Sequence, residues 1–256
     1  MHANSSMRHA LALVLALALA FPATAQTRPR NMDQDAFVAA NLIAIFYHEL
    51  GHALIDVMEL PIFGQEEDAA DVLSILMVHE IFEEQSAVDI AYATAMGLAR
   101  EAEIRTTLGE ETVWWGVHGA DMQRYYTLVC LFYGAAPDRR RPFAAELGLP
   151  DARAETCPEE YELAQRAWGP VLDELYAAGP GETLRFRTVG RMGREARLPA
   201  AIIREEVNAL NAVMSLPVRI WVDVARCGEP NAFYDPSTRE IIMCTEFASY
   251  LAEIAS

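Results

Sequence analysis

The sequence contains no lysine: its 20 basic residues are all arginine, they stand against 37 acidic residues, and the formal net charge is −17 at pH 7. A protein that binds nucleic acid must neutralise phosphates with basic side chains, and an anionic membrane surface attracts basic proteins in the same way. The excess of acidic residues therefore argues against binding to nucleic acid and to an anionic membrane. We therefore expect no nucleic-acid partner.

One continuous apolar run stands at the N-terminus, and it is too short to cross a bilayer as a permanent helix. Arg8 precedes the run, which extends over residues 11–21, and residues 22–25 supply a small-residue cleavage pattern. We therefore expect residues 1–25 to be a bacterial signal peptide. The mature chain would be periplasmic or secreted, with no stable membrane insertion after signal removal. An uncleaved membrane anchor is the alternative.

Cysteine is scarce, with four residues in the chain, and no two of them have the short spacing that zinc-binding cysteines usually show. A cysteine-based metal site is therefore the weaker interpretation. An even number of cysteines in an exported chain instead predicts two disulfides. Cys227 and Cys244 bracket a hairpin-like segment, which favours a bond between them and leaves Cys130 with Cys157.

Helical periodicity dominates the mature chain. Helices are expected over residues 37–58, 66–82 with a possible extension toward residue 90, 91–105, 121–133, 158–178 and 200–214, and a short helix from residue 246. Residues 135–158 look like a loop-rich connection. Residues 179–199 are rich in glycine, proline and arginine, which is typical of an exposed linker or ribbon.

A β-hairpin is expected near the C-terminus. Residues 218–225 alternate in the manner of a strand, residues 235–238 are a strong turn signal, and residues 239–244 supply a partner strand. We therefore predict an α+β fold that is mostly helical. It would form a single domain over residues 26–256, with a small β-hairpin region at about 215–256.

The segment His48-Glu49-Leu50-Gly51-His52 lies inside the first expected helix. Residues four apart share a helix face, so His48 and His52 can offer two imidazole nitrogens to one ion, while Glu49 projects toward the same cavity. This is the HExxH zinc motif, in which Glu49 would be the general base that activates a water for attack on a carbonyl. Two surface histidines beside a solvated glutamate are the alternative, which the apolar flanks of the motif disfavour.

An acidic cluster at residues 66–71 follows a turn that can fold it back onto the motif. Within it, Glu67 and Asp71 are four residues apart, which resembles the Glu-x-x-x-Asp pattern of the thermolysin-like zinc peptidases, the gluzincins. The resemblance implies that Glu67 is the third metal ligand and that Asp71 orients His48. The connection is shorter than in thermolysin, so Glu66 and Asp68 remain alternatives, as does an acidic helix start that binds no metal.

A donor aimed at the developing oxyanion would also be needed. His118, which follows a Trp-Trp-Gly segment, and Tyr126 on the next helix are our candidate catalytic residues, with Tyr125 beside them. A packing or capping role is the alternative for each. His79 and Glu80 imitate a second metal site, but no second histidine has the right spacing, so we expect a solvated helical face.

Three segments together resemble a family of bacterial proteins described as "putative metallopeptidases": residues 46–56 with 66–71, residues 121–134, and residues 227–236 with Cys244. They cover most of the mature chain, and the first carries the metal motif. The resemblance implies a zincin-like fold. In zincins, however, the strands precede the metal helix, whereas here they close the chain. Either the order is permuted, with the termini near each other, or the hairpin is a separate element. Residues 231–234 are the first candidate for the edge strand that aligns a peptide.

These features predict an exported zinc metallopeptidase that hydrolyses a peptide or protein substrate. Zn²⁺ would be held by His48, His52 and Glu67, although two histidines and a carboxylate also suit cobalt or manganese. Two other classes stay open. One is a zinc amidase or deformylase-like enzyme that acts on a non-protein amide. The other is a metal-containing binding module without catalysis, which would recognise a partner through the aromatic segment 114–133.

Overall fold

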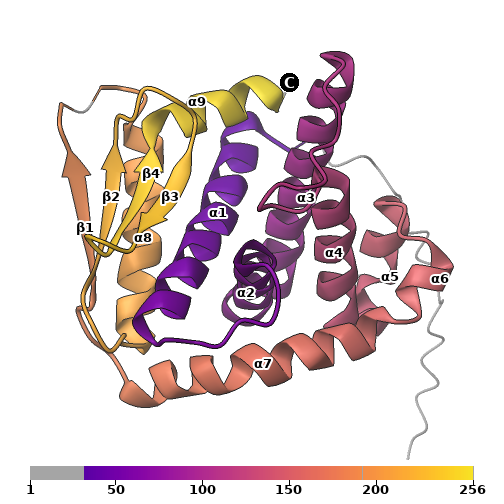
Figure 1. Cartoon of the computed structure of the whole chain (residues 1–256), viewed down its shortest axis with the longest axis horizontal. Coiled ribbons are helices and arrows are strands. Elements are labelled where there is room, and N and C mark those ends of the chain that lie inside the picture. The colour runs from indigo at the N-terminus through magenta and orange to yellow at the C-terminus, as the bar shows by residue number, and fades with distance from the viewer. Residues whose placement is uncertain (1–31, 192, 256) are drawn as a thin grey trace, which may run out of the picture. The chain divides into compact units, whose positions relative to one another are not determined.

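The helix that carries the metal motif lies at the centre of the protein (Figure 1). The computed structural model describes residues 32–191 and 193–255, so the expected signal peptide lies outside the described residues. The central helix, α1 (Gln34–Val57), packs against α2 (Glu66–Ile81), α3 (Glu84–Thr107), α8 (Arg197–Val213) and α9 (Thr245–Ile254). By length and composition α1 could cross a membrane, but 78% of its most apolar window is buried in the protein. We therefore describe it as a core helix.

The remaining helices correct two expectations. The segment after residue 134 is not loop-rich, because α4 (Asp121–Gly134) is followed by α5 (Pro137–Glu146), α6 (Asp151–Ala154) and α7 (Cys157–Ala178). Proline stands in the first turn of α5, where its missing N–H costs nothing, and this start signal was overlooked. The second helix also does not continue toward residue 90. It ends at Ile81, since Phe82 and Glu83 are extended, and α3 begins at Glu84.

The strands form a four-stranded sheet in the order β1-β2-β4-β3. They are β1 (Leu184–Val189), β2 (Ile220–Ala225), β3 (Ala232–Asp235) and β4 (Glu240–Cys244). The expected partners β2 and β4 are parallel neighbours rather than a hairpin, and the turn at residues 235–238 instead joins β4 to the antiparallel β3. The mostly helical α+β prediction is confirmed, with a larger sheet than expected.

β1 occupies the segment that was interpreted as a linker. Its sequence alternates apolar residues with arginines, and the charge of Arg187 obscured that pattern. In the sheet the Arg187 guanidinium donates to Asp223 at 2.7 Å and to Glu240 at 2.6 Å, and its carbon lies 4.1 Å from the Trp221 ring centre. The carboxylates on β2 and β4 therefore stabilise the charge of Arg187 within the strand.

The two ends of the described chain lie side by side. The Gln34 side chain at the start of α1 donates a hydrogen bond of 2.5 Å to the carbonyl of Ala252 in α9, and the two helices pack together. Strands β3 and β4 also contact α1, so the strand region is not a separate element.

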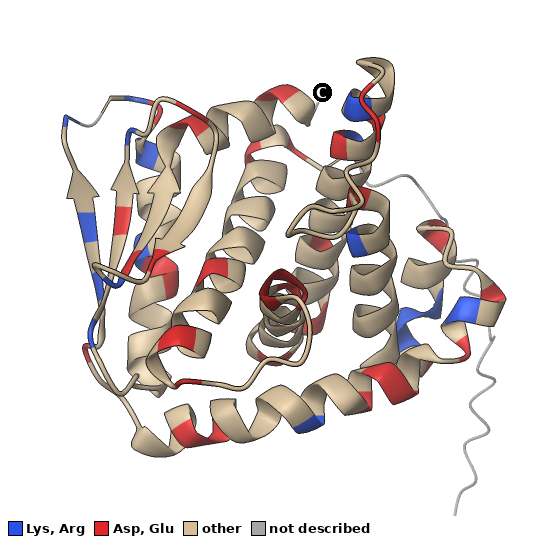
Figure 2. Cartoon of the chain, viewed as in Figure 1, with Lys and Arg blue, Asp and Glu red and all other residues tan. Residues whose placement is uncertain are grey.

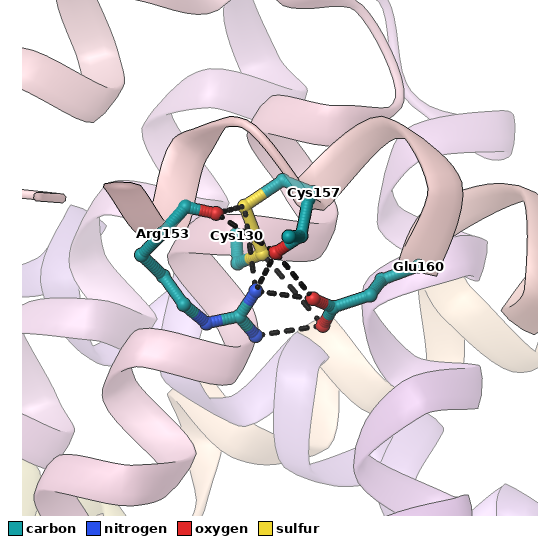
Figure 3. Close-up of a disulfide and its surroundings, with 5 residues drawn as sticks. Cys130, Arg153, Cys157 and Glu160 are labelled. Atoms are coloured by element: carbon teal, nitrogen blue, oxygen red, sulfur yellow. Dashed lines mark hydrogen bonds and ion pairs between the residues drawn. A yellow bond between two sulfur atoms is a disulfide. The ribbon is translucent and has the colours of Figure 1, made fainter. Parts of the chain in front are cut away.

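Two disulfides are present, with the pairing favoured from the sequence. Cys130–Cys157 joins α4 to the first residue of α7 (Figure 3), and Cys227–Cys244 joins the loop after β2 to the end of β4. Gly134 lies where these helices meet, and a Cβ there would stand 2.2 Å from the carbonyl oxygen of Cys157. Next to the first disulfide, Arg153 pairs with Glu160.

His79 belongs to a structural cluster, not to a solvated face. The guanidinium of Arg140, which is 1% exposed, donates to His79 Nδ1 and to Glu84 at 2.9 Å and to the Phe132 carbonyl at 2.7 Å. Burial and the neighbouring Arg140 lower the pKa of His79, which fits a neutral ring that accepts a hydrogen bond. The cluster connects α2, α3, α4 and α5 through these hydrogen bonds. Glu80, the neighbour of His79, is exposed.

Candidate metal centre

The helical spacing of the motif brings two imidazole rings together on one face of α1. His48 Nε2 and His52 Nε2 lie 3.2 Å apart, and the ring centres are 4.8 Å apart. His48 is 3% exposed and Glu49 is 5% exposed, because the flanking apolar residues hold this part of α1 inside the protein. The alternative of a wet, solvent-facing histidine pair does not fit this burial.

Close packing of α1 against α2 brings the acidic cluster to the histidines. Gly51 permits the approach, since a Cβ at this position would stand 2.9 Å from the Ala70 Cα. A larger residue at 51 would therefore push α2 away from α1. The start of α2 is strongly acidic (Figure 2), with three carboxylates in its first turn.

Glu67 is the acidic residue that reaches both histidines. Its Oε2 lies 3.1 Å from His48 Nε2 and 3.2 Å from His52 Nε2. The three atoms lie within 4.8 Å of one another, a group that could hold a metal ion. Two imidazole nitrogens and one carboxylate oxygen are also the donor set of many catalytic zinc sites, so the residues present fit zinc.

Carboxylates also bind the far nitrogens of both rings. Asp71 Oδ1 lies 2.8 Å from His48 Nδ1, and Glu66 Oε1 lies 2.7 Å from His52 Nδ1. An ionised carboxylate can only accept, so each keeps a proton on Nδ1 and directs Nε2 toward the cluster. Glu66 thus belongs to the site, but it contacts Nδ1 of His52 and not the Nε2 that faces the cluster.

Arg124 on α4 holds Asp71 in turn, and the sequence analysis missed it. Its Nε donates to Asp71 Oδ2 at 2.7 Å and its Nη2 to Asp71 Oδ1 at 2.8 Å. Burial alone would raise the pKa of Asp71, but these bonds and the one to His48 hold it well below its usual range. A signal was present: Arg124 is the only basic residue of α4, a helix rich in aromatic and aliphatic residues.

His118 reaches the site from the loop before α4. Its Nε2 lies 2.8 Å from Glu67 Oε2, and its ring is stacked 6.3 Å from that of His48. The side chain is 51% exposed, so it stands between the cluster and solvent. Its position is compatible with a donor to bound substrate.

Tyr126 does not reach the site. It is two residues after Arg124, about 200° around the helix, so it faces away from the cluster. Its ring instead packs edge-on against Tyr125, with 5.1 Å between centres, and the Tyr125 hydroxyl donates to the carbonyl of Leu147. The structure therefore does not bring either tyrosine to the cluster.

The pKa values of Glu49 and Glu67 are shifted in opposite directions. Burial raises the pKa of Glu49, and the neighbouring histidines oppose this shift only in part. Burial would likewise raise the pKa of Glu67, but hydrogen bonds with three histidines hold it far below its usual range. For His48, burial lowers the pKa, but the bonds to Asp71 and Glu67 overcome this effect and raise it to about 9. Glu67 is thus ionised, while Glu49 has the higher proton affinity that a general base needs.

A cavity of about 780 Å³ opens beside the cluster, and we name it the first cavity. It lies between α1, the start of α2, the loop before α4 and strand β3. It is lined by His48, Glu49, His52, Ile55, Asp56, Gln65, Glu66, Glu67, Trp115, Gly116, Val117, His118, Asn231, Ala232, Phe233, Tyr234 and Pro236.

Residues 4–172 and 195–256 match the protein family described as "Putative metallopeptidase". The chain belongs to this family. The match covers the metal motif, the acidic cluster and the strand region around β3 and β4. No curated protein and no solved structure matches the chain. Membership in a metallopeptidase family implies a metal ion and a peptide or protein substrate, and His48, His52 and Glu67 are the residues that could hold the ion.

Proposed function

We propose that this member of the metallopeptidase family is an exported zinc peptidase, with His48, His52 and Glu67 as the metal ligands and Glu49 as the general base. The observation that carries the proposal is the convergence of two Nε2 atoms and one carboxylate oxygen within 4.8 Å, directly beside a buried glutamate. When bound there, zinc supplies a Lewis acid and lowers the pKa of a water to about 7.

Glu49 carries the proton transfers. Its raised pKa equips it to take a proton from the attacking water and to deliver a proton to the leaving amine nitrogen. In the reaction the water oxygen bonds to the carbonyl carbon and the C–N bond breaks, which yields a carboxylate and an amine. His118 donates to the carbonyl oxygen as negative charge develops there.

Strand β3 supplies the surface that aligns the substrate backbone. It is an edge strand, paired with β4 alone, and the carbonyl of Asn231 accepts from the Cys244 N–H. Antiparallel pairs alternate, so the backbone groups of Ala232 and Tyr234 point away from β4. The Ala232 N–H donates to Asn231 Oδ1 at 2.9 Å, so the Ala232 carbonyl and the backbone groups of Tyr234 are the ones offered to a peptide. Both residues line the first cavity, where an extended peptide can add to this edge.

Export is supported by the two disulfides, which form and persist in oxidising compartments. We place the mature protein in the periplasm or outside the cell.

The test is hydrolysis of a library of internally quenched peptides by zinc-loaded protein, wild type beside Glu49→Gln. We expect the variant to lose about 10² to 10⁴-fold in kcat/KM because this is what proton transfer by a positioned base contributes. It should still bind one zinc per chain. Zinc binding without cleavage of any peptide by the wild type would contradict the proposal and favour the silent binding module, or a zinc amidase if a small non-protein amide is cleaved.

A further inference from the structure

A second cavity, of about 610 Å³, meets the first at the metal residues. The two share five lining residues: His48, Glu49, His118, Asn231 and Ala232. Beyond the shared part, the second cavity is lined by residues of α1, α2, α3, α4 and α9, with Pro230 from the loop before β3. The catalytic residues therefore lie where two hollows join, not at the end of one.

The two cavities extend in opposite directions along α1. The first continues past His52 to Asp56, and the second runs back from His48 to Asn41. At 1.5 Å per helical residue these stretches are about 12 Å and about 10 Å long. An extended peptide advances about 3.3 Å per residue, so each side has room for about three residues.

The second cavity is suited to apolar side chains. Aliphatic and aromatic residues form much of its wall: Ala44, Ile45, Ile75, Leu98, Leu128, Phe247, Leu251 and Ile254. Its uncharged polar groups are already engaged within the protein, because Asn41 donates to the carbonyls of Phe37 and Ala93, and the hydroxyls of Ser74 and Thr94 donate to backbone carbonyls. A polar substrate group would find few free partners there.

Both arginines that line the second cavity, and two of the carboxylates that line the first, also have partners within the protein. In the second cavity, Arg105 donates to Asp121 at 2.9 Å and Arg124 is paired with Asp71. In the first cavity, the Tyr234 hydroxyl donates to Asp56 at 2.7 Å and Glu66 is paired with His52. Among the described lining residues, each arginine is paired with a carboxylate, so neither has an unbalanced charge to capture a C-terminal carboxylate.

From these observations, and resting on the proposed function, we infer that the protein is an endopeptidase. An internal segment of a polypeptide lies across the metal centre, with about three residues in each cavity. On the side of the second cavity, a large apolar side chain is preferred. Because the cleft continues past the metal residues on both sides, removal of the terminal charges should leave recognition intact.

The experiment compares one apolar decapeptide with free termini and its doubly blocked form, acetylated and amidated. Binding to zinc-loaded Glu49→Gln is measured by fluorescence anisotropy, which does not depend on turnover, and cleavage by the wild type is followed by mass spectrometry. We expect the two Kd values to agree within about threefold and cleavage at an internal bond of both peptides. Binding or cleavage that requires a free terminus would overturn the inference.

Leu98→Trp tests the second cavity, because the larger ring fills it from α3. The matched control is Leu163→Trp, the same substitution at an exposed position that lines neither cavity. We expect Leu98→Trp to weaken binding of the blocked peptide at least tenfold, with zinc content and Tm as in the control. Unchanged binding in a folded Leu98→Trp protein would overturn the role of the second cavity.

The two hypotheses fail in different ways. Cleavage of amino-terminal or carboxy-terminal residues alone would refute the endopeptidase and leave the zinc peptidase standing. Binding of the blocked peptide with no cleavage by the zinc-loaded wild type would refute the zinc peptidase, and with it the endopeptidase that rests on it.

Discussion

Replacement of Asp71 with asparagine tests how the protein orients its metal-binding histidine. The Asp71 carboxylate lies 2.8 Å from His48 Nδ1, and only 17% of Asp71 and 4% of His48 are exposed. A hydrogen bond to a buried charged group contributes about 1.5–3 kcal/mol. Loss of such an outer partner lowers metal affinity by about 10 to 100-fold, which corresponds to about 1.4–2.7 kcal/mol. The two magnitudes agree, so we expect Asp71→Asn to weaken zinc binding within this range.

The matched control is Glu66→Gln, which also removes one negative charge from a carboxylate bound to Nδ1 of a ligand histidine. Its partner is His52, at 2.7 Å, but Glu66 is 52% exposed. Exposed ion pairs contribute about 0–1 kcal/mol, so this variant should lose less than about fivefold in affinity. Burial, and not charge alone, would then explain the difference between the two variants.

Competition with a chromophoric zinc chelator at neutral pH gives both affinities, and thermal unfolding of the metal-free proteins shows whether each variant folds. Asparagine still offers an oxygen to Arg124, so the fold should persist. Equal losses in the two variants, or a larger loss in Glu66→Gln, would refute the role that we assign to Asp71.

Three further outcomes are expected. The metal-free protein should lose stability as pH rises from 6.5 through 9, because the His48 pKa is about 9 in the folded state against 6.5 for an ordinary histidine; urea unfolding at a series of pH values measures this, and a rise in stability would contradict it. Zinc affinity should increase across the same interval, since the metal displaces the His48 proton, and a pH-independent affinity from calorimetry would contradict that. Arg140→Ala should cost about 3 kcal/mol of unfolding free energy because it leaves the buried Phe132 carbonyl without its donor and Glu84 without its cation. Zinc content, by elemental analysis, should stay at the wild-type value, and a normal Tm would show that the Arg140 cluster is not structural.

The metal helix could be read from the sequence because its signals agree. The apolar periodicity of residues 37–58 and the four-residue spacings in the motif and in Glu67 and Asp71 all point to helices that share one site. The local pattern therefore predicted α1, while Asp71 as the partner of His48 came from the resemblance to the gluzincin pattern.

Long-range partners could not be read in this way. Arg124 is 53 residues from Asp71 along the chain, and nothing in either local sequence states that they meet. The same holds for β1, where Arg187 interrupts the apolar pattern and becomes acceptable only through Asp223 and Glu240 on other strands. Tyr126 is the opposite case: it lies near His118 in sequence, but the helical rotation after Arg124 turns it away from the site.

The central claim is that His48, His52 and Glu67 form one zinc site. It is tested most directly by elemental analysis of the purified mature protein, wild type beside His52→Ala and Glu67→Ala. We predict one zinc per chain in the wild type and none in either folded variant. Zinc retained after removal of Glu67, or no zinc in the wild type after mild preparation, would contradict the account.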